Sequence, residues 1–346
     1  TPADPGTAAV TGRAAAADTA ADTATGTGMS MRDRGFLGSP EGILLDRMRH
    51  GQIRRVKKGS GGRSLGFKLY FAEGGKAYFK PDQSFSGTNW YAELAAYHLD
   101  RALGLGRVPP VVGRTIPWGR LETAAADDRR VPEIQRDSRD RVRGALIWWL
   151  DKPPQPATTP PGWENWIRVE PLSRWKVSPL QRAAAYGAAL RHRRERARAG
   201  KEALAAFESV PEPDTPERAA ELSDLLLFDF LTINIDRWGG NNANVLTLGR
   251  GGPLIFLDNA AGFSVGPHER RLMDDRFRLC QRFRRSTVEA LKALDMEALE
   301  RRLVRDPIGP VLDDHFIEGI AVRRRIALEH IAEMRQRHGD DDVLAW

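Results

Sequence analysis

Residues 224–263 constrain the fold more than any other part of the chain. They read DLLLFDFLTINIDRWGGNNANVLTLGRGGPLIFLDNAAGF, so a strongly apolar helix runs directly into a polar cluster at Asp236. Two short apolar strands follow, joined by a glycine-rich turn, and the second strand ends at Asp258. Because a hairpin returns the chain to the edge where it began, we expect Asp258 to lie beside Asp236. The fold must therefore gather two carboxylates where the helix and the hairpin meet.

The polar residues of this segment suit phosphoryl transfer. Catalysis of that reaction is mostly positioning and charge neutralisation, so the protein supplies a carboxylate for the acceptor's proton and oxygen ligands for divalent ions. In protein kinases the base Asp and a metal-binding Asn are five positions apart, as Asp236 and Asn241 are. Protein kinases have a second metal-binding Asp further along the chain, and Asp258 stands in the corresponding place here. The neighbouring Asn242 and Asn244 leave open which amide is the ligand.

The first half of the chain contains the residues that a kinase places opposite these acids. Alternating apolar residues predict a hairpin over residues 67–80 that ends in Lys80. Helical spacing predicts a helix over residues 89–103 that carries Glu93. In kinases a strand lysine holds the nucleotide phosphates and a helix glutamate fixes the lysine. The sequence therefore predicts a Lys80–Glu93 pair.

A glycine-bearing stretch, residues 59–66, precedes this hairpin. It matches neither the GxGxxG pattern nor a Walker loop, so a phosphate cover and an ordinary turn both remain open. If the stretch covers phosphates, Gly61 and Gly62 are the candidate nucleotide contacts.

The order of elements predicts an α+β protein with a two-lobed, protein kinase-like fold. Residues 1–35 are rich in Ala and Thr and poor in large apolar residues, so we expect a disordered tail. Residues 36–145 mix short strands with one helix and predict a small β-rich N-lobe. Residues 146–346 are mainly helical and predict a larger C-lobe, with a Trp/Pro-rich insertion around residues 150–178.

Composition excludes several classes of protein. The 346 residues carry 53 Lys and Arg against 46 Asp and Glu, a moderately basic balance, and no run approaches the length of about 18 apolar residues that a membrane span requires. Cys280 is the only cysteine, so an internal disulfide and a cysteine-based zinc site are excluded. No base-reading motif accompanies the arginines, so we do not expect a nucleic-acid partner, and the basic run at residues 191–198 is interpreted as a solvated helix face.

Several strings of residues resemble one kinase family: AYFKP, AELAAYHLDRALGLGRVPPVVGR, DLLLFDFLTINIDR, LIFLDNAAGF and CQRFRRST. They look like the secretory-pathway kinases that include the Golgi casein kinase and the four-jointed cadherin-domain kinase, with the second to fourth strings closest to four-jointed. The resemblance extends over residues 50–295 and is weakest in the Trp/Pro-rich middle. It implies ATP and either Mg²⁺ or Mn²⁺ as cofactors.

The resemblance also implies a role for individual residues. Lys80 would be the nucleotide lysine, and Glu93 its helix partner and a further metal contact. Asp236 would be the catalytic base, and Asp258 the metal-binding aspartate that stands where DFG stands in ordinary kinases. Lys68, on the preceding strand, resembles a second phosphate-contacting lysine.

Two departures from the family bear on substrate and origin. Trp238 follows the Asp-Arg pair where the Golgi casein kinase has histidine, which leaves the substrate class open. One cysteine cannot form the disulfides of animal members, which indicates a distant, bacterial relative. We therefore expect a phosphotransferase that acts on Ser or Thr of a protein; a carbohydrate hydroxyl as acceptor and a catalytically silent, nucleotide-binding pseudokinase are the alternatives.

The chain begins with Thr1 and not with Met. Two interpretations stay open at this point. Removal of an export signal would make the protein exported or periplasmic, whereas a trimmed start would be compatible with the cytoplasm.

Overall fold

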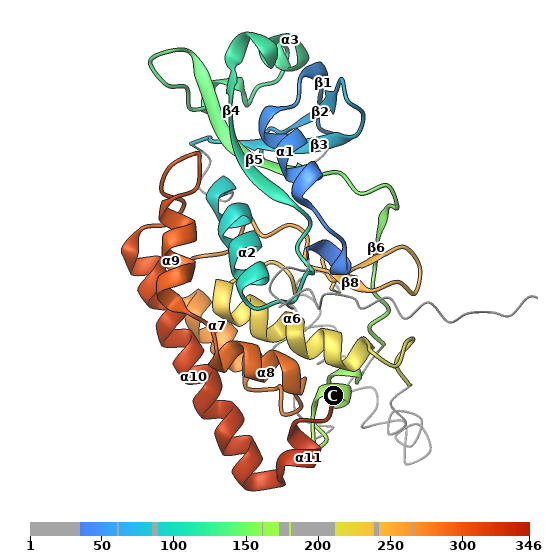
Figure 1. The fold of residues 1–346 in the computed structure, drawn as a ribbon. Helices are drawn as coiled ribbons and strands as arrows, with labels where there is room; N and C mark the ends of the chain where they lie inside the picture. The colour runs from blue at the N-terminus through green and yellow to red at the C-terminus, as the bar shows by residue number, and fades with distance from the viewer. Residues whose placement is uncertain are drawn as a thin grey trace, which may run out of the picture.

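A computed structural model describes residues 35–60, 62–84, 89–160, 162–172, 180, 212–238, 242–264 and 266–346. The predicted tail up to residue 34, the basic run at 191–198, Gly61 and Asn241 lie outside these described residues. The β-rich part precedes the mainly helical part along the chain, and the two lie on top of each other (Figure 1). This is the predicted α+β arrangement of a small β-rich lobe and a larger helical one.

A five-stranded antiparallel sheet in the order β1-β2-β3-β5-β4 forms the smaller part. Its strands are β1 (Ile53–Lys58), β2 (Phe67–Phe71), β3 (Lys76–Pro81), β4 (Val111–Pro117) and β5 (Arg141–Trp148). Alternate residues of β2 and β3 are buried in one apolar cluster that includes Phe67 and Phe79. Because side chains alternate along a strand, Tyr78 and Lys80 point to the opposite face of the sheet.

Strand β5 starts at Arg141, earlier than the apolar run of residues 144–150, and ends at Trp148. Pairing with β4 explains the earlier start, since Arg141 lies opposite Pro117 and so extends the ladder beyond the apolar run. The strand continues to Trp148 and so crosses the position between residues 145 and 146 where the lobe boundary is predicted. The lobe boundary stays a prediction.

Short elements complete the β-rich part. They are the helices α1 (Gly42–His50) and α3 (Glu122–Ala125) and the 3-10 turns η2 (Phe36–Gly38), η3 (Trp118–Arg120) and η4 (Val131–Glu133). Apolar residues of α1 and of the η3 to η4 region, among them Met48 and Trp118, join the core under the sheet.

Helix α2 (Trp90–Ala102) lies between the sheet and the helical part (Figure 1). The predicted apolar positions are buried, including Ala92, Ala96 and Leu99, but they join the larger core of the helical part. The helix also contacts β4, β5 and α9 (Met296–Val304). Glu93, in its first turn, is therefore held where the two parts meet.

Helix α6 (Arg218–Thr232) is the centre of the helical part. All of its residues are buried, so the helix has neighbours on every side. Helix α6 packs against η5 (Trp163–Ile167), α7 (Pro267–Phe277) and α10 (Asp314–His338), and a side-chain hydrogen bond links it to α8 (Arg285–Lys292). Helix α11 (Asp340–Val343) packs against α10. Helix α6 ends when Ile233 adopts a left-handed conformation with φ 52°, and this turn directs the chain toward Asp236.

The predicted hairpin after α6 is present. Strands β7 (Leu246–Leu248) and β8 (Leu254–Ile255) pair antiparallel, and β6 (Pro154–Pro156) adds a third strand to β7. Asp258 follows β8 directly after the buried residue Phe256 and the half-buried Leu257.

Cys280 is buried in the helical core. Burial raises the pKa of its thiol to about 12, so the thiol is protonated and unreactive in the native protein. Within the described ranges, no helix is both long and apolar enough to cross a bilayer.

Candidate active site

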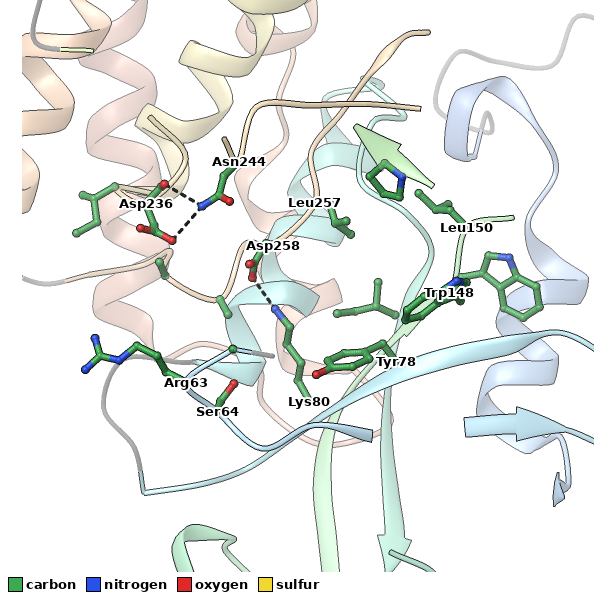
Figure 2. Close-up of a pocket in the computed structure, with 17 residues that line it drawn as sticks. Arg63, Ser64, Tyr78, Lys80, Trp148, Leu150, Asp236, Asn244, Leu257 and Asp258 are labelled. Carbon is green, nitrogen blue, oxygen red and sulfur yellow. Dashed lines mark hydrogen bonds and ion pairs between the residues drawn. The ribbon is translucent and has the colours of Figure 1, made fainter. Parts of the chain in front are cut away.

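A pocket of about 700 Å³ opens between the sheet and the hairpin of the helical part. Figure 2 shows Lys80 and Asp258 in the middle of this pocket, Asp236 and Asn244 on one side, and Trp148 and Leu150 on the other. Charged and polar lining residues are Arg63, Ser64, Lys80, Asp236, Asn244 and Asp258. Aromatic and aliphatic ones include Tyr78, Ile147, Trp148, Trp149, Leu150 and Leu257. The pocket thus has one charged end and one apolar end.

Lys80 connects the two parts of the molecule. Its Nζ donates to Glu93 Oε1 on α2 at 2.5 Å and to Asp258 Oδ1 after β8 at 2.7 Å. Burial lowers the pKa of Lys80, but the carboxylates of Asp258 and Glu93 outweigh it, so the pKa lies above its ordinary value. The structure therefore brings together three residues that the sequence predicts to act together.

Asp258 presents its carboxylate to the pocket. Its side chain is 57% exposed, so an incoming ligand can reach it. The charge of Lys80 lowers the pKa of Asp258, and the carboxylate is therefore ionised at neutral pH. The residue has a φ of 62°, a left-handed conformation that is uncommon outside glycine and concentrates at functional sites.

Asn259 locks Glu93 in place. Its backbone N–H donates to Glu93 Oε1 at 3.1 Å, and its side-chain amide donates to Glu93 Oε2 at 3.4 Å. Both carboxylate oxygens of Glu93 therefore accept hydrogen bonds. The metal contact predicted for Glu93 stays a prediction, and it requires Lys80 or Asn259 to move away from the carboxylate. The sequence analysis missed Asn259, although its place directly after Asp258 was a usable signal.

Asp236 lies in the turn after α6, and Asn244 orients it. The Asn244 amide donates to Asp236 Oδ2 at 3.1 Å and to the Asp236 backbone oxygen at 3.2 Å. Asn242 is buried, in a left-handed conformation, and does not line the pocket. The metal role predicted for Asn241 lies outside the described residues and stays a prediction.

A buried ion pair lies beneath the two acidic turns. Arg237 Nε is 3.2 Å from Asp229 Oδ2, and both side chains are fully buried. Arg237 also donates to Asn259 Oδ1 at 2.7 Å and to the backbone oxygen of Leu257. The pair thereby fixes the Asp236 turn against the Asp258 turn. The sequence signal for it was an acid, Asp229, inside an otherwise apolar helix.

Trp238 completes this buried cluster. Its indole N–H donates to Asp229 Oδ2 at 2.8 Å, and its ring stacks on Trp163 with centroids 5.5 Å apart. Burial raises the pKa of Asp229 to about 6, although Arg237 and the Trp238 hydrogen bond act in the opposite direction. Trp238 therefore belongs to the core and not to the lining of the pocket.

Two predicted nucleotide contacts lie at the edge of the pocket. Lys68 does not line it; the Lys68 ammonium lies over the ring of Trp149, 4.5 Å from its centre, and that ring does line the pocket. Gly62 lines the pocket, with a φ of 83°. The nucleotide contacts predicted for Lys68 and Gly62 stay predictions.

The glycine-bearing stretch has a structural use at its two ends. Gly59 donates its N–H to the Gly66 oxygen at 2.8 Å, which closes the stretch into a loop. A Cβ at either glycine would collide with the Tyr78 side chain. Both glycines therefore leave room for Tyr78 in the pocket wall.

The donor set of the pocket fits a divalent cation that arrives with a nucleotide. Among the described residues, no cluster of three or more acids, histidines or cysteines forms a protein-only cage. Mg²⁺ is commonly held by one or two carboxylates together with substrate phosphates, and Asp258 offers one exposed carboxylate beside Lys80. Asp258 is accordingly the residue that would hold the cation.

These features define a kinase-like protein: an antiparallel sheet, a strand lysine paired with a glutamate of α2, and the two turns that carry Asp236 and Asp258. Solved structures share this fold. The Golgi casein kinase with Mn/ADP bound has a TM-score of 0.62 at 18% identity, covering 90% of this chain and 80% of that one. Hydra Fam20 with sugar has a TM-score of 0.63 at 22% identity, covering 90% and 94%. The predicted two-lobed fold is confirmed.

The chain belongs to the Fam20 family, because the family model described as Golgi casein kinase, C-terminal, Fam20 matches residues 39–128 and 178–343. The human extracellular serine/threonine protein kinase FAM20C is 25% identical, with 87% of this chain and 56% of the relative covered. Human glycosaminoglycan xylosylkinase is also 25% identical, with 88% and 78% covered. Mouse pseudokinase FAM20A is 24% identical, with 82% and 56% covered. The chain thus spans little more than half the length of FAM20C. The closer likeness to four-jointed and the bacterial origin stay predictions.

Proposed function

We propose that the chain is an ATP-dependent kinase that transfers the γ-phosphoryl group to a hydroxyl, foremost that of Ser or Thr in a protein. The observation that carries this proposal is Lys80, held by Glu93 and Asp258 in a pocket that also contains Asp236. Membership in a family described by a Golgi casein kinase supports the same reaction.

Each end of the pocket has a use in this reaction. The apolar end suits a purine base, and the Lys80 ammonium suits the α and β phosphates. Asp236 accepts the proton of the acceptor hydroxyl while the hydroxyl oxygen bonds to the γ phosphorus of ATP. At the same time the bond between the γ phosphorus and the β–γ bridging oxygen breaks, and ADP leaves. Mg²⁺ or Mn²⁺, bound with ATP at Asp258, supplies charge neutralisation on the transferred group.

A carbohydrate hydroxyl is the second candidate acceptor. The xylosylkinase relative matches this chain at the same identity as the protein kinase and over a larger share of its own length. Trp238, which replaces the histidine of the Golgi casein kinase, is buried in the core, so this departure does not decide between the two acceptors. A silent pseudokinase is disfavoured because Lys80, Asp236 and Asp258 are all in place.

The proposal is tested by ATP turnover with Mn²⁺ or Mg²⁺ and three acceptor conditions: dephosphorylated casein, a xylose-containing oligosaccharide, and none. Phosphate transfer to one acceptor identifies the substrate class. Asp236→Asn is expected to lower the rate by about 10²–10⁴-fold, because it removes the general base. The control is the exposed Asp342→Asn. If the protein binds ATP but transfers phosphate in none of the three acceptor conditions, the pseudokinase is favoured and the proposal is refuted.

Asn244→Ala is expected to lower kcat about tenfold with little change in the KM for ATP. The substitution removes the amide that orients Asp236, while Lys80 and the apolar end of the pocket stay intact. Steady-state kinetics with the acceptor found above measure both constants. A rise in KM for ATP with unchanged kcat would contradict this positioning role.

We also propose an exported location for the protein. The support is that a human relative is named an extracellular kinase and a structural neighbour is the Golgi casein kinase. Fractionation of the source cell, with the protein found only in the cytoplasm, would refute this part of the proposal.

A further inference from the structure

We propose that a second cavity, formed by α1, α2 and α9, binds a ligand that carries several phosphate or sulfate groups. The cavity has a volume of about 560 Å³, and no residue lines both this cavity and the candidate active site. Helices α2 and α9 lie side by side along one flank of the molecule (Figure 1). The lining contains five arginines and one carboxylate, Asp306.

One wall of the cavity is a face of α9 and its C-terminal residue. Arg301 and Arg302 lie three and four positions after Ala298 and share one side of α9 with it, and Arg305 is the C-cap residue directly after the helix. The other side, with Leu299 and Leu303, is buried in the core. The small Ala298 side chain leaves space between the arginines and α2.

The charged residues of the α2 wall already have partners. Arg101 donates to Glu41 at 2.8 and 2.9 Å and also bonds to Asp100. His98 is 3.0 Å from Asp306. The only carboxylate that lines the cavity is therefore engaged, and it does not serve the α9 arginines.

Three arginines of the cavity have no such partner. Arg301 reaches Glu297 at 3.6 Å, but no described carboxylate lies within ion-pair distance of Arg49, Arg302 or Arg305. Helix C-termini attract cations, which explains a basic residue in the last turn of α1 and of α9. Arg302 and Arg305 are exposed to solvent and Arg49 is half-buried. The attraction of the helix ends does not by itself require three guanidinium groups without an ion-pair partner to line one cavity, where they repel each other.

A polyanion removes this repulsion. Guanidinium groups bind phosphate and sulfate with paired hydrogen bonds, and three of them from two helices match a compact ligand with several such groups. An apolar ligand would leave the arginines uncompensated, and a cation would be repelled. The chemistry of the lining therefore favours a compact polyanion.

Isothermal titration with two probes tests the proposal: inositol hexakisphosphate and sucrose octasulfate. Wild type is expected to bind at least one probe. The triple variant Arg49→Gln, Arg302→Gln, Arg305→Gln is expected to bind it about tenfold or more weakly. Tighter binding of the first probe assigns the site to phosphate, and tighter binding of the second assigns it to sulfate.

The matched control removes three exposed arginines elsewhere, Arg54→Gln, Arg120→Gln and Arg250→Gln, and is expected to bind like wild type. Lys80→Met, which alters the candidate active site alone, is also expected to bind like wild type. Melting curves check that all variants fold. No binding by wild type, an equal loss in the control, or full binding by the cavity variant would overturn the proposal.

Discussion

Replacing Asp258 with Asn is expected to lower ATP turnover on the order of a thousandfold while the fold stays intact. The amide keeps the shape of the side chain but removes the charge that would hold the divalent cation, and metal stabilisation of transferred charge is worth several kcal/mol. The stability cost is expected to be small, because the Asp258 side chain is more than half exposed and its ion pair with Lys80 is screened by water.

Turnover at saturating ATP and thermal melting together measure this effect. Asp342→Asn is the matched control, since it removes one exposed aspartate far along the chain in α11. Turnover by the Asp258→Asn variant within about threefold of wild type would show that Asp258 is not the metal-binding residue.

Arg237→Met is expected to reduce the free energy of unfolding by about 3–5 kcal/mol. The substitution leaves the Asp229 carboxylate in a site that no solvent reaches, where the Trp238 indole is the one remaining side-chain donor among the described residues. It also removes the hydrogen bonds from Arg237 to Asn259 and to the Leu257 backbone oxygen. Urea unfolding followed by tryptophan fluorescence measures the loss.

The pH dependence identifies the cause of this loss. Burial already raises the pKa of Asp229 to about 6, and the loss of Arg237 raises it further. Between the ordinary pKa of Asp229 in the unfolded chain and its raised pKa in the folded variant, the folded variant holds a proton that the unfolded chain has released. The free energy of unfolding of the variant therefore falls as the pH rises through this interval. The destabilisation is therefore expected to be larger at about pH 7.5 than at about pH 5.

A double variant, Arg237→Met with Asp229→Asn, provides the control. It has no buried carboxylate, so most of the extra loss at neutral pH should disappear. An Arg237→Met protein as stable as wild type at neutral pH would contradict the role given to the pair.

Three of the predicted site residues stand at positions that a local sequence pattern places. Lys80 ends a strand, Glu93 lies in the first turn of a helix, and Asp258 ends a hairpin, so hydrophobic periodicity alone places them. Lys80 joins Glu93 to Asp258 because the two parts pack together, as the likeness to known kinases anticipated, and Lys80 and Asp258 line the pocket while Glu93 is buried behind them.

The contacts that support these residues were not predictable in the same way. Asn259 meets Glu93 across 166 positions of sequence, and no local period reports such a contact. Strand β5 starts at Arg141 because β4 pairs with it there, not because the residues are apolar. Trp148, the last residue of β5, and Trp149, directly after the strand, both line the pocket, which no local pattern of the sequence reports.

The hydrogen bonds from Asn259 to Glu93 have a consequence for control of activity. Many kinases are switched off by swinging the glutamate-bearing helix away from the catalytic cleft. Here such a swing would strand a buried carboxylate and break its link through Asn259 to Arg237. We expect α2 to be fixed in its working position before any nucleotide arrives. We therefore expect the active site to be assembled without a ligand, so that the rate of phosphate transfer depends on the concentrations of ATP and acceptor.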